Sequence, residues 1–189
     1  MSALSGRRHE PAEQPQPQRL LLPMTALHLD AVATTEATAY AFPWSRGNFV
    51  DSLAAGHAAQ VLCGPDGALL GYFVAMPGVD ELHLLNITVA PDVQGHGHAV
   101  HMLDALHALC RQLQARQLWL EVRESNARAR AIYLRHGFVH VGVRKGYYPA
   151  PRGKREDAAV MSLRVANAGP SAAAAEAPAN APRGGDGLD

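Results

Sequence analysis

The chain of 189 residues has little cysteine, no net charge and no long apolar run. Its only two cysteines, Cys63 and Cys110, match no metal-binding or redox spacing, so we expect two buried, reduced thiols. Lys and Arg number 17 and Asp and Glu number 17, a balance that gives no electrostatic footprint for nucleic acid or an anionic membrane. No apolar stretch approaches the roughly 18 residues of a membrane helix. We therefore expect a cytoplasmic protein with no direct nucleic-acid or membrane partner.

The two ends of the chain differ in composition from its middle. Residues 1–18 are rich in Pro, Gln and charge, and residues 167–189 read "NAGPSAAAAEAPANAPRGGDGLD". Neither segment offers enough apolar surface to offset its ordering entropy, so both are predicted to be disordered tails. One domain, 19–166, remains between them.

Within this domain, apolar patterns alternate between strand and helix periods. Turn chemistry favours a hairpin at Pro65-Asp66-Gly67, and helix boundaries are indicated by the caps Thr25 and Ser45 and by the stops Gly56 and Gly137. We predict strands at 19–24, 58–64, 68–77, 80–90, 117–123, 138–148 and 156–165, and helices in 25–40, 45–56, 91–113 and 125–136. The order predicts an α/β fold: a mixed central sheet flanked by helices, with one βαβ unit at its centre.

The third helix is the most strongly patterned of the four. Its predicted core stripe recurs at spacings of three and four residues and consists of Val100, Leu103, Leu106, Cys110 and Leu113.

The start of this helix, "PDVQGHGHAV" (91–100), is built from small and polar residues. A helix N-terminus after a strand points its free amides at the ligand edge of the sheet, and Gly95, Gly97 and Ala99 would let a phosphate approach them. The spacing matches neither a dinucleotide fingerprint nor a P-loop. Two other readings stay open here: a solvated polar turn, or a metal held by His96, His98 and His101, for which no carboxylate ligand is evident.

Several segments together resemble the GNAT superfamily of acetyl-coenzyme A-dependent N-acetyltransferases. "NITVAPDVQGHGHA" (86–99) is similar to the family's pyrophosphate-binding motif. "LWLEVRESNARARAIYLRHGF" (118–138) is similar to its second signature, "AFPWSRGNF" (41–49) to its substrate-side helix entry, and "YYP…EDAAVM" to its last hairpin. The second signature and the last hairpin are specific to the protein N-terminal branch, and the likeness is closest to the RimI-type enzymes, which acetylate the N-terminal alanine of a small-subunit ribosomal protein. The resemblance spans residues 36–164.

The resemblance implies a GNAT fold and acetyl-coenzyme A as co-substrate, with no metal. The implied coenzyme-binding residues are Ile87, Thr88, Val89, Gly95, His96, Gly97, His98, Ala99, Val100 and Asn126. One feature departs from the family: after the glutamine it usually carries two basic residues, where this chain has Gly95 and His96. Bare backbone would then hold the pyrophosphate, and a protonated His96 would replace part of the missing charge.

Two residues of the second signature are implied to be catalytic. Glu121 would accept the amine proton, through a water, and burial between apolar strand residues would make its carboxylate a better base. Tyr133 would protonate the leaving thiolate. From pattern alone, Glu121 is equally a glutamate on an outward strand face, Tyr133 a core tyrosine and Asn126 only a helix cap.

A protein N-terminus suits this chemistry. With a reference pKa near 7.8, about a third of α-amines are neutral at pH 7.5, against about 0.1% of lysine amines. The predicted substrate is therefore the N-terminus of a small-subunit ribosomal protein. Other N-termini, a lysine, a small amine, or a non-catalytic role in sensing acyl-coenzyme A stay open as alternatives.

Overall fold

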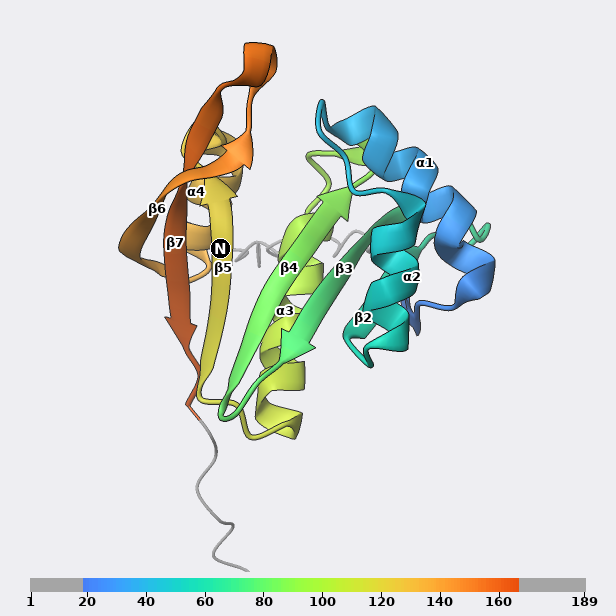
Figure 1. Cartoon of the computed structure of the whole chain (residues 1–189). Helices are drawn as coiled ribbons and strands as arrows, with labels where there is room; N and C mark the ends of the chain where they lie inside the picture. The colour runs from blue at the N-terminus through green and yellow to red at the C-terminus, as the bar shows by residue number, and fades with distance from the viewer. Residues whose placement is uncertain (1–18, 167–189) are drawn as a thin grey trace, which may run out of the picture.

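Seven strands form one mixed sheet in the order β1-β2-β3-β4-β5-β7-β6 (Figure 1). The computed structural model describes residues 19–166; the two predicted tails lie outside them. The strands are β1 (Leu20–Pro23), β2 (Ala58–Cys63), β3 (Leu69–Pro77), β4 (Glu81–Val89), β5 (Gln117–Arg123), β6 (Val139–Pro149) and β7 (Arg155–Arg164). The α-helices are α1 (Leu29–Ala39), α2 (Arg46–Ala54), α3 (His98–Gln112) and α4 (Ala127–Arg135). The predicted α/β class, mixed sheet and flanking helices are confirmed.

Most predicted boundaries are also confirmed, because the capping residues act as expected. The Ser45 hydroxyl accepts from the Asn48 amide at the start of α2, and the Asn126 side chain accepts from the Ala129 amide at the start of α4. Two details differ. Residues 26–28 form a 3-10 turn before α1 instead of its first turn. The sequence also predicts that the last strand, 156–165, closes the sheet, but β7 lies between β5 and β6 and pairs with both.

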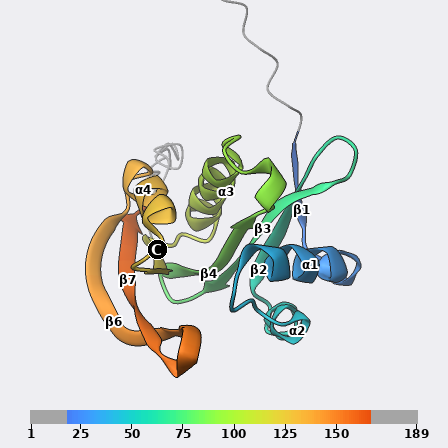
Figure 2. The ribbon, with the colours of Figure 1, turned by 90° about the horizontal axis from the view of Figure 1, so that it is seen from above.

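Two helix layers cover the two faces of the sheet (Figure 2). On one face, α1 and α2 bury Val32 and Phe49 against Val61, Tyr72 and Val74 of β2 and β3. On the other face, α3 and α4 pack over a larger core that contains these buried residues: Phe73, Leu82, Leu84, Leu103, Leu106, Leu118, Leu120 and Phe138. The even residues of β5 therefore face α3 and α4, and its odd residues face the opposite side.

The predicted stripe of α3 is correct in its middle and wrong at both ends. Leu103, Leu106 and Cys110 are fully buried, whereas Val100 and Leu113 are 44% and 47% exposed. Leu113 lies beyond the last helical residue. Val100 lies in the first turn, where it lines an open cleft instead of the sheet. The missing contacts are made by Met102, which is fully buried.

The central βαβ unit contains a gap. Parallel strands β4 and β5 pair only between 81–84 and 117–120, and a bulge opposite Val74 and Ala75 interrupts β4 just beyond that point. The two strands then diverge, as Figure 1 shows. Carbonyls on the free edge of β4 are bonded by side chains instead: Ile87 accepts from Tyr40 and Val89 from Gln94. The divergence opens the sheet where the N-terminus of α3 begins.

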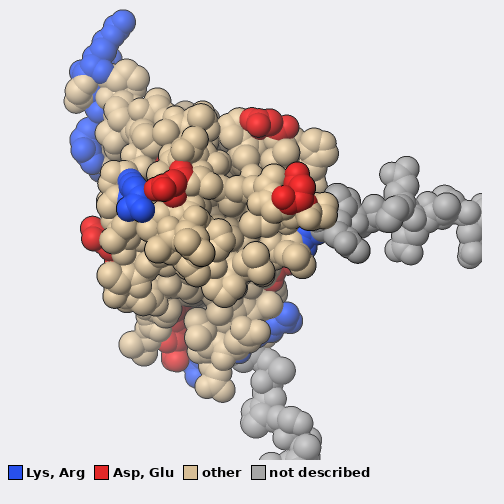
Figure 3. Space-filling model, turned by 90° about the vertical axis from the view of Figure 1, so that its right-hand side faces the viewer, with Lys and Arg blue, Asp and Glu red and all other residues tan. Residues whose placement is uncertain are grey.

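Both cysteines are buried and free, as predicted, and burial raises the pKa of the Cys110 thiol to about 11. Within residues 19–166, no helix is long and apolar enough to cross a membrane. The side of the molecule that carries α1 and α2 shows a few separate charges of both signs (Figure 3).

Candidate active site

The turn before α3 presents a set of free backbone amides. Gly95 and Gly97 have φ values of +91° and +76°, in the left-handed region that favours glycine, and a Cβ at either position would meet no atom within 4 Å. Among the residues that the structure describes, no acceptor bonds the amides of 95–100. These amides line a cleft of about 370 Å³ with the N-terminal end of α4. Such an array at a helix N-terminus binds anions.

The histidines of this turn are engaged with protein groups. The Nδ1 of His96 lies 3.1 Å from the Val93 carbonyl, and the Nδ1 of His98 lies 3.1 Å from the Arg19 guanidinium. Burial, followed by the charge of Arg19, lowers the pKa of His98. Within residues 19–166, no three His, Cys, Asp or Glu side chains gather as the ligands of one metal ion. Of the ten predicted coenzyme-binding residues, His96 and Thr88 do not line the cleft.

A second cleft, of about 590 Å³, occupies the gap between β4 and β5. It is lined by Glu121 and Arg123 of β5, the loop between α1 and α2, and Tyr148 and Pro149 of β6. Four residues line both clefts: Tyr40, Ile87, Asn126 and Tyr133. The two clefts therefore meet, and the amide-lined turn and Glu121 lie at opposite ends of one path.

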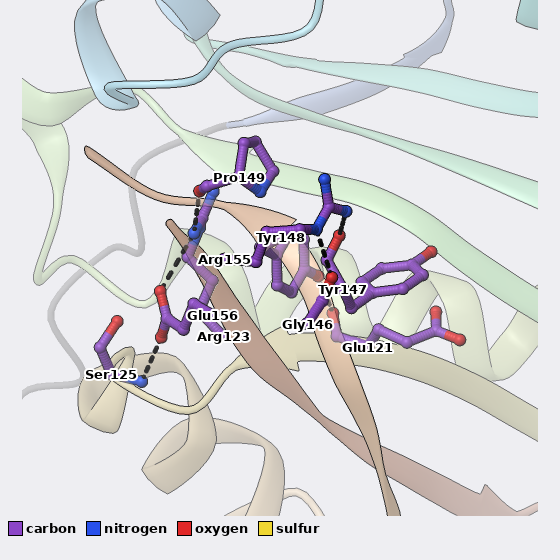
Figure 4. A network of polar contacts seen from close by, with 9 residues as sticks. All are labelled: Glu121, Arg123, Ser125, Gly146, Tyr147, Tyr148, Pro149, Arg155 and Glu156. Atoms are coloured by element: carbon purple, nitrogen blue, oxygen red, sulfur yellow. Dashed lines mark hydrogen bonds and ion pairs between the residues drawn. The ribbon is translucent and has the colours of Figure 1, made fainter. Parts of the chain in front are cut away.

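Glu121 projects from β5 on the side of the sheet opposite α3. Its side chain is 15% exposed, and its carboxylate lies 3.1 Å from the guanidinium of Arg144 on β6. The prediction that Glu121 lies among apolar residues is therefore wrong in part, because β6 places the guanidinium of Arg144 beside its carboxylate. Figure 4 shows the carboxylate pointing away from the neighbouring Arg123–Glu156 pair. Glu121 is therefore a partly buried carboxylate at the cleft wall.

Tyr133 comes from α4 on the other side of the gap. It is 8% exposed, its ring lies 5.6 Å from that of Phe138, and it lines both clefts. Burial, followed by the nearby Tyr40 and Tyr148, raises its pKa above that of free tyrosine. It is thus both a core tyrosine and a protonated phenol at the junction of the clefts. Asn126 likewise combines its cap bond with a place in both cleft walls.

Of the β4 residues, Ile87 and Val89 line the amide-lined cleft, and their carbonyls point to the free strand edge. The side chain of Thr88 points the other way. It is 3% exposed and lies 3.3 Å from the carboxylate of Glu36. Only the backbone of Thr88 is available to the role that the resemblance implies.

Glu36, which the sequence analysis did not single out, organises the floor of the second cleft. Its carboxylate is 2% exposed and accepts from the Trp44 amide at 2.9 Å, the Asn86 amide group at 3.2 Å and the Tyr72 hydroxyl. These bonds tie α1 to the loop that enters α2 and to β4. The sequence holds one signal for this role: Glu36 is a glutamate on the apolar face of a predicted helix.

The end of the β6–β7 hairpin forms a further network that the sequence analysis missed (Figure 4). Arg123 donates to the Pro149 carbonyl at 2.9 Å and to Glu156 at 3.0 Å, and its guanidinium lies 4.5 Å from the centre of the Tyr148 ring. The Tyr148 hydroxyl donates to the Glu121 carbonyl at 2.9 Å. The hairpin is thereby fixed against the strand that carries Glu121.

A mixed sheet that parts in front of an anion-binding turn is the fold of an acetyltransferase. The model of the acetyltransferase (GNAT) family matches residues 29–138, and the chain belongs to this family. It is 37% identical over 131 residues to the [ribosomal protein bS18]-alanine N-acetyltransferase of Haemophilus ducreyi, covering 68% of this chain and 88% of that one. It is 36% identical over 137 residues to the enzyme of that name from Escherichia coli K12, covering 72% and 91%.

Solved structures agree with this assignment. The crystal structure of the ribosomal-protein-S18-alanine N-acetyltransferase from Escherichia coli superposes with a TM-score of 0.74 at 33% identity, covering 82% of this chain and 98% of that chain. A phosphinothricin acetyltransferase from Sinorhizobium meliloti, solved in complex with AcCoA, shares the fold with a TM-score of 0.65 at 19% identity. It covers 78% of this chain and 88% of that one.

Proposed function

We propose that this acetyltransferase moves the acetyl group of acetyl-coenzyme A to the α-amine of the N-terminal alanine of the small-subunit ribosomal protein bS18. The relatives at 36–37% identity carry that activity in their names, and the chain covers 86–91% of their length. A ribosomal-protein substrate places the enzyme in the cytoplasm, where ribosomes are assembled.

One observation carries the proposal: the two clefts share four lining residues and so form one path. The free amides of 95–100 hold the coenzyme pyrophosphate at one end. The free edge of β4 at Ile87 and Val89 accompanies the pantetheine arm into the gap between the strands. The peptide N-terminus enters from the other end, beside Glu121, between the α1–α2 loop and the β6–β7 hairpin.

At the meeting point the amine nitrogen attacks the thioester carbonyl, so that a C–N bond forms and the C–S bond breaks. Glu121 takes the amine proton, through a water that bridges the cleft. Tyr133 gives its proton to the departing thiolate. Burial of Tyr133 keeps the phenol protonated, which is the form that a proton donor needs.

The test is a turnover assay with acetyl-coenzyme A and the N-terminal peptide of bS18. Three matched peptides serve as controls: one with its α-amine blocked, one with an added internal lysine and a blocked N-terminus, and one with the first alanine replaced by proline. Mass spectrometry should place one acetyl group on the free α-amine of alanine alone. Acetylation of the lysine, of a small amine such as spermidine, or of none of the substrates would contradict the proposal.

A further inference from the structure

The turn that receives the coenzyme phosphates offers them no lysine or arginine of its own, since residues 91–100 read "PDVQGHGHAV". His96 faces the Val93 carbonyl, and burial, followed by the charge of Arg19, lowers the pKa of His98. Backbone amides alone would therefore face a ligand that carries several negative charges. Within residues 19–166, the cations nearest to this turn come from other elements.

Arg128 and Arg135 of α4 line the amide-lined cleft. Arg128 donates from Nη1 to the Gln94 side chain at 2.8 Å, which places its guanidinium beside the turn. Arg19, which precedes β1 and does not line the cleft, donates to the His96 carbonyl at 3.4 Å and lies 3.1 Å from His98. None of these three arginines forms an ion pair with a carboxylate in the described part of the chain. The charges of Arg128 and Arg135, which line the cleft, are therefore available to a ligand.

The position of Arg128 is unfavourable for the fold by itself. It is the second residue of α4, where the positive end of the helix dipole disfavours a cation, and no acidic residue lies in that first turn. The N-terminus of α3 faces the same cleft. The N-terminal ends of α3 and α4 and the guanidinium of Arg128, which has no carboxylate partner in the described residues, thus surround one cleft. An anion bound there would stabilise this arrangement.

We propose that Arg128 binds the phosphates of the coenzyme beside the turn, while Arg19 holds the turn in position. The inference rests on the proposed use of acetyl-coenzyme A. It names an anion-binding side chain on α4 in addition to the backbone of the turn. A guanidinium suits this role, because its fork of N–H groups matches two phosphate oxygens.

Titration calorimetry with coenzyme A and with pantetheine, which lacks the phosphates, tests the proposal on the full chain. Arg128→Ala should weaken coenzyme A binding about tenfold and leave pantetheine binding unchanged. Arg128→Lys should recover part of the loss. Arg19→Ala should weaken coenzyme A binding by a smaller factor, again with pantetheine unaffected. The matched control is Arg130→Ala on the same helix, whose guanidinium bonds the Glu124 carbonyl and does not line the cleft.

The salt dependence gives a second readout, because fewer charge contacts lower the slope of log Kd against log salt. An Arg128→Ala affinity equal to that of Arg130→Ala overturns the inference and leaves the proposed function intact. Equal losses for coenzyme A and pantetheine also overturn it, since Arg128 would then shape the cleft without contacting phosphate. If the parent protein binds no coenzyme A, the proposed function fails together with the inference.

Discussion

The carboxylate of Glu121 on β5 and the guanidinium of Arg144 on β6 lie 3.1 Å apart, although 23 positions separate the two residues in the chain. Strand β7 lies between β5 and β6 in the sheet, so the ion pair spans a whole strand. In the proposed mechanism, the orientation that this pair gives the Glu121 carboxylate decides whether it reaches the amine. The ion pair with Arg144 therefore helps to position the carboxylate of Glu121 in the cleft wall.

Arg144→Gln should lower kcat roughly fivefold, because the carboxylate loses the partner that orients it. In a Glu121→Gln background the same change should have little further effect, since there is no charge left to orient. Steady-state kinetics of the four proteins of this double-mutant cycle measure the coupling. Lys145→Gln is the control: Lys145 is the next residue on β6 and pairs with Asp157 instead. Equal effects of both substitutions would show that β6 charge, and not the pair, matters.

Glu36 should be the most costly single carboxylate to remove. Glu36→Ala leaves the Trp44 amide, the Tyr72 hydroxyl and the Asn86 side chain without their acceptor inside the protein. Each such orphaned donor costs about 1–3 kcal/mol, so we expect a loss of roughly 3 kcal/mol or more in the free energy of unfolding. Asp30→Ala on the same helix removes only an exposed pair with Arg46 and should cost less than about 1 kcal/mol. Urea unfolding measures both, and similar losses would refute the central role of Glu36.

Gly97→Val should weaken coenzyme A binding strongly. The residue has a φ of +76°, and an added side chain would project into the open approach to the amides. Gly67→Val in the β2–β3 turn is a matched control, because that glycine has a φ of +81°, equally open surroundings and no place in the lining of either cleft. Both should lose similar stability, whereas calorimetry should detect weaker binding only for Gly97→Val. His96→Ala should bind almost normally; a loss equal to that of Gly97→Val would point back to the histidines.

The sequence predicted local features well, because they depend on neighbours in the chain. Ser45 and Asn126 cap their helices, and "QLWLEVR" forms the predicted strand. Long-range pairings were not readable in the same way. Nothing local to Glu121 indicates that Arg144 will face it, since that depends on the insertion of β7 between β5 and β6. The bonds from Arg19 to His96 and from Asn86 to Glu36 likewise form only when distant segments meet.

The catalytic pair itself was named from the resemblance, and the structure adds its environment. Glu121 and Tyr133 reach the gap from opposite faces of the sheet, which no periodicity could show. Val100 is a residue for which the local pattern gave the wrong prediction. Apolar spacing placed it in the core stripe, but its turn of α3 projects past the sheet into the cleft.

The central claim is that Glu121 accepts a proton and Tyr133 donates one. Glu121→Gln and Tyr133→Phe keep the shape of each side chain, and each should lower kcat by roughly one to three orders of magnitude. The two losses should differ in pH dependence. As pH rises, more of the amine arrives neutral, so the Glu121→Gln loss should shrink. The Tyr133→Phe loss should stay constant, because burial raises the pKa of Tyr133 and its phenol remains protonated throughout this range.

The most direct measurement is kcat from pH 6 to 9.5 for the parent and both variants, at saturating acetyl-coenzyme A and alanine peptide. The account predicts a Glu121→Gln deficit that narrows toward high pH beside a flat Tyr133→Phe deficit. Turnover by Glu121→Gln equal to that of the parent at every pH would contradict it, and Glu121 would then be only the partner of Arg144 on the strand face.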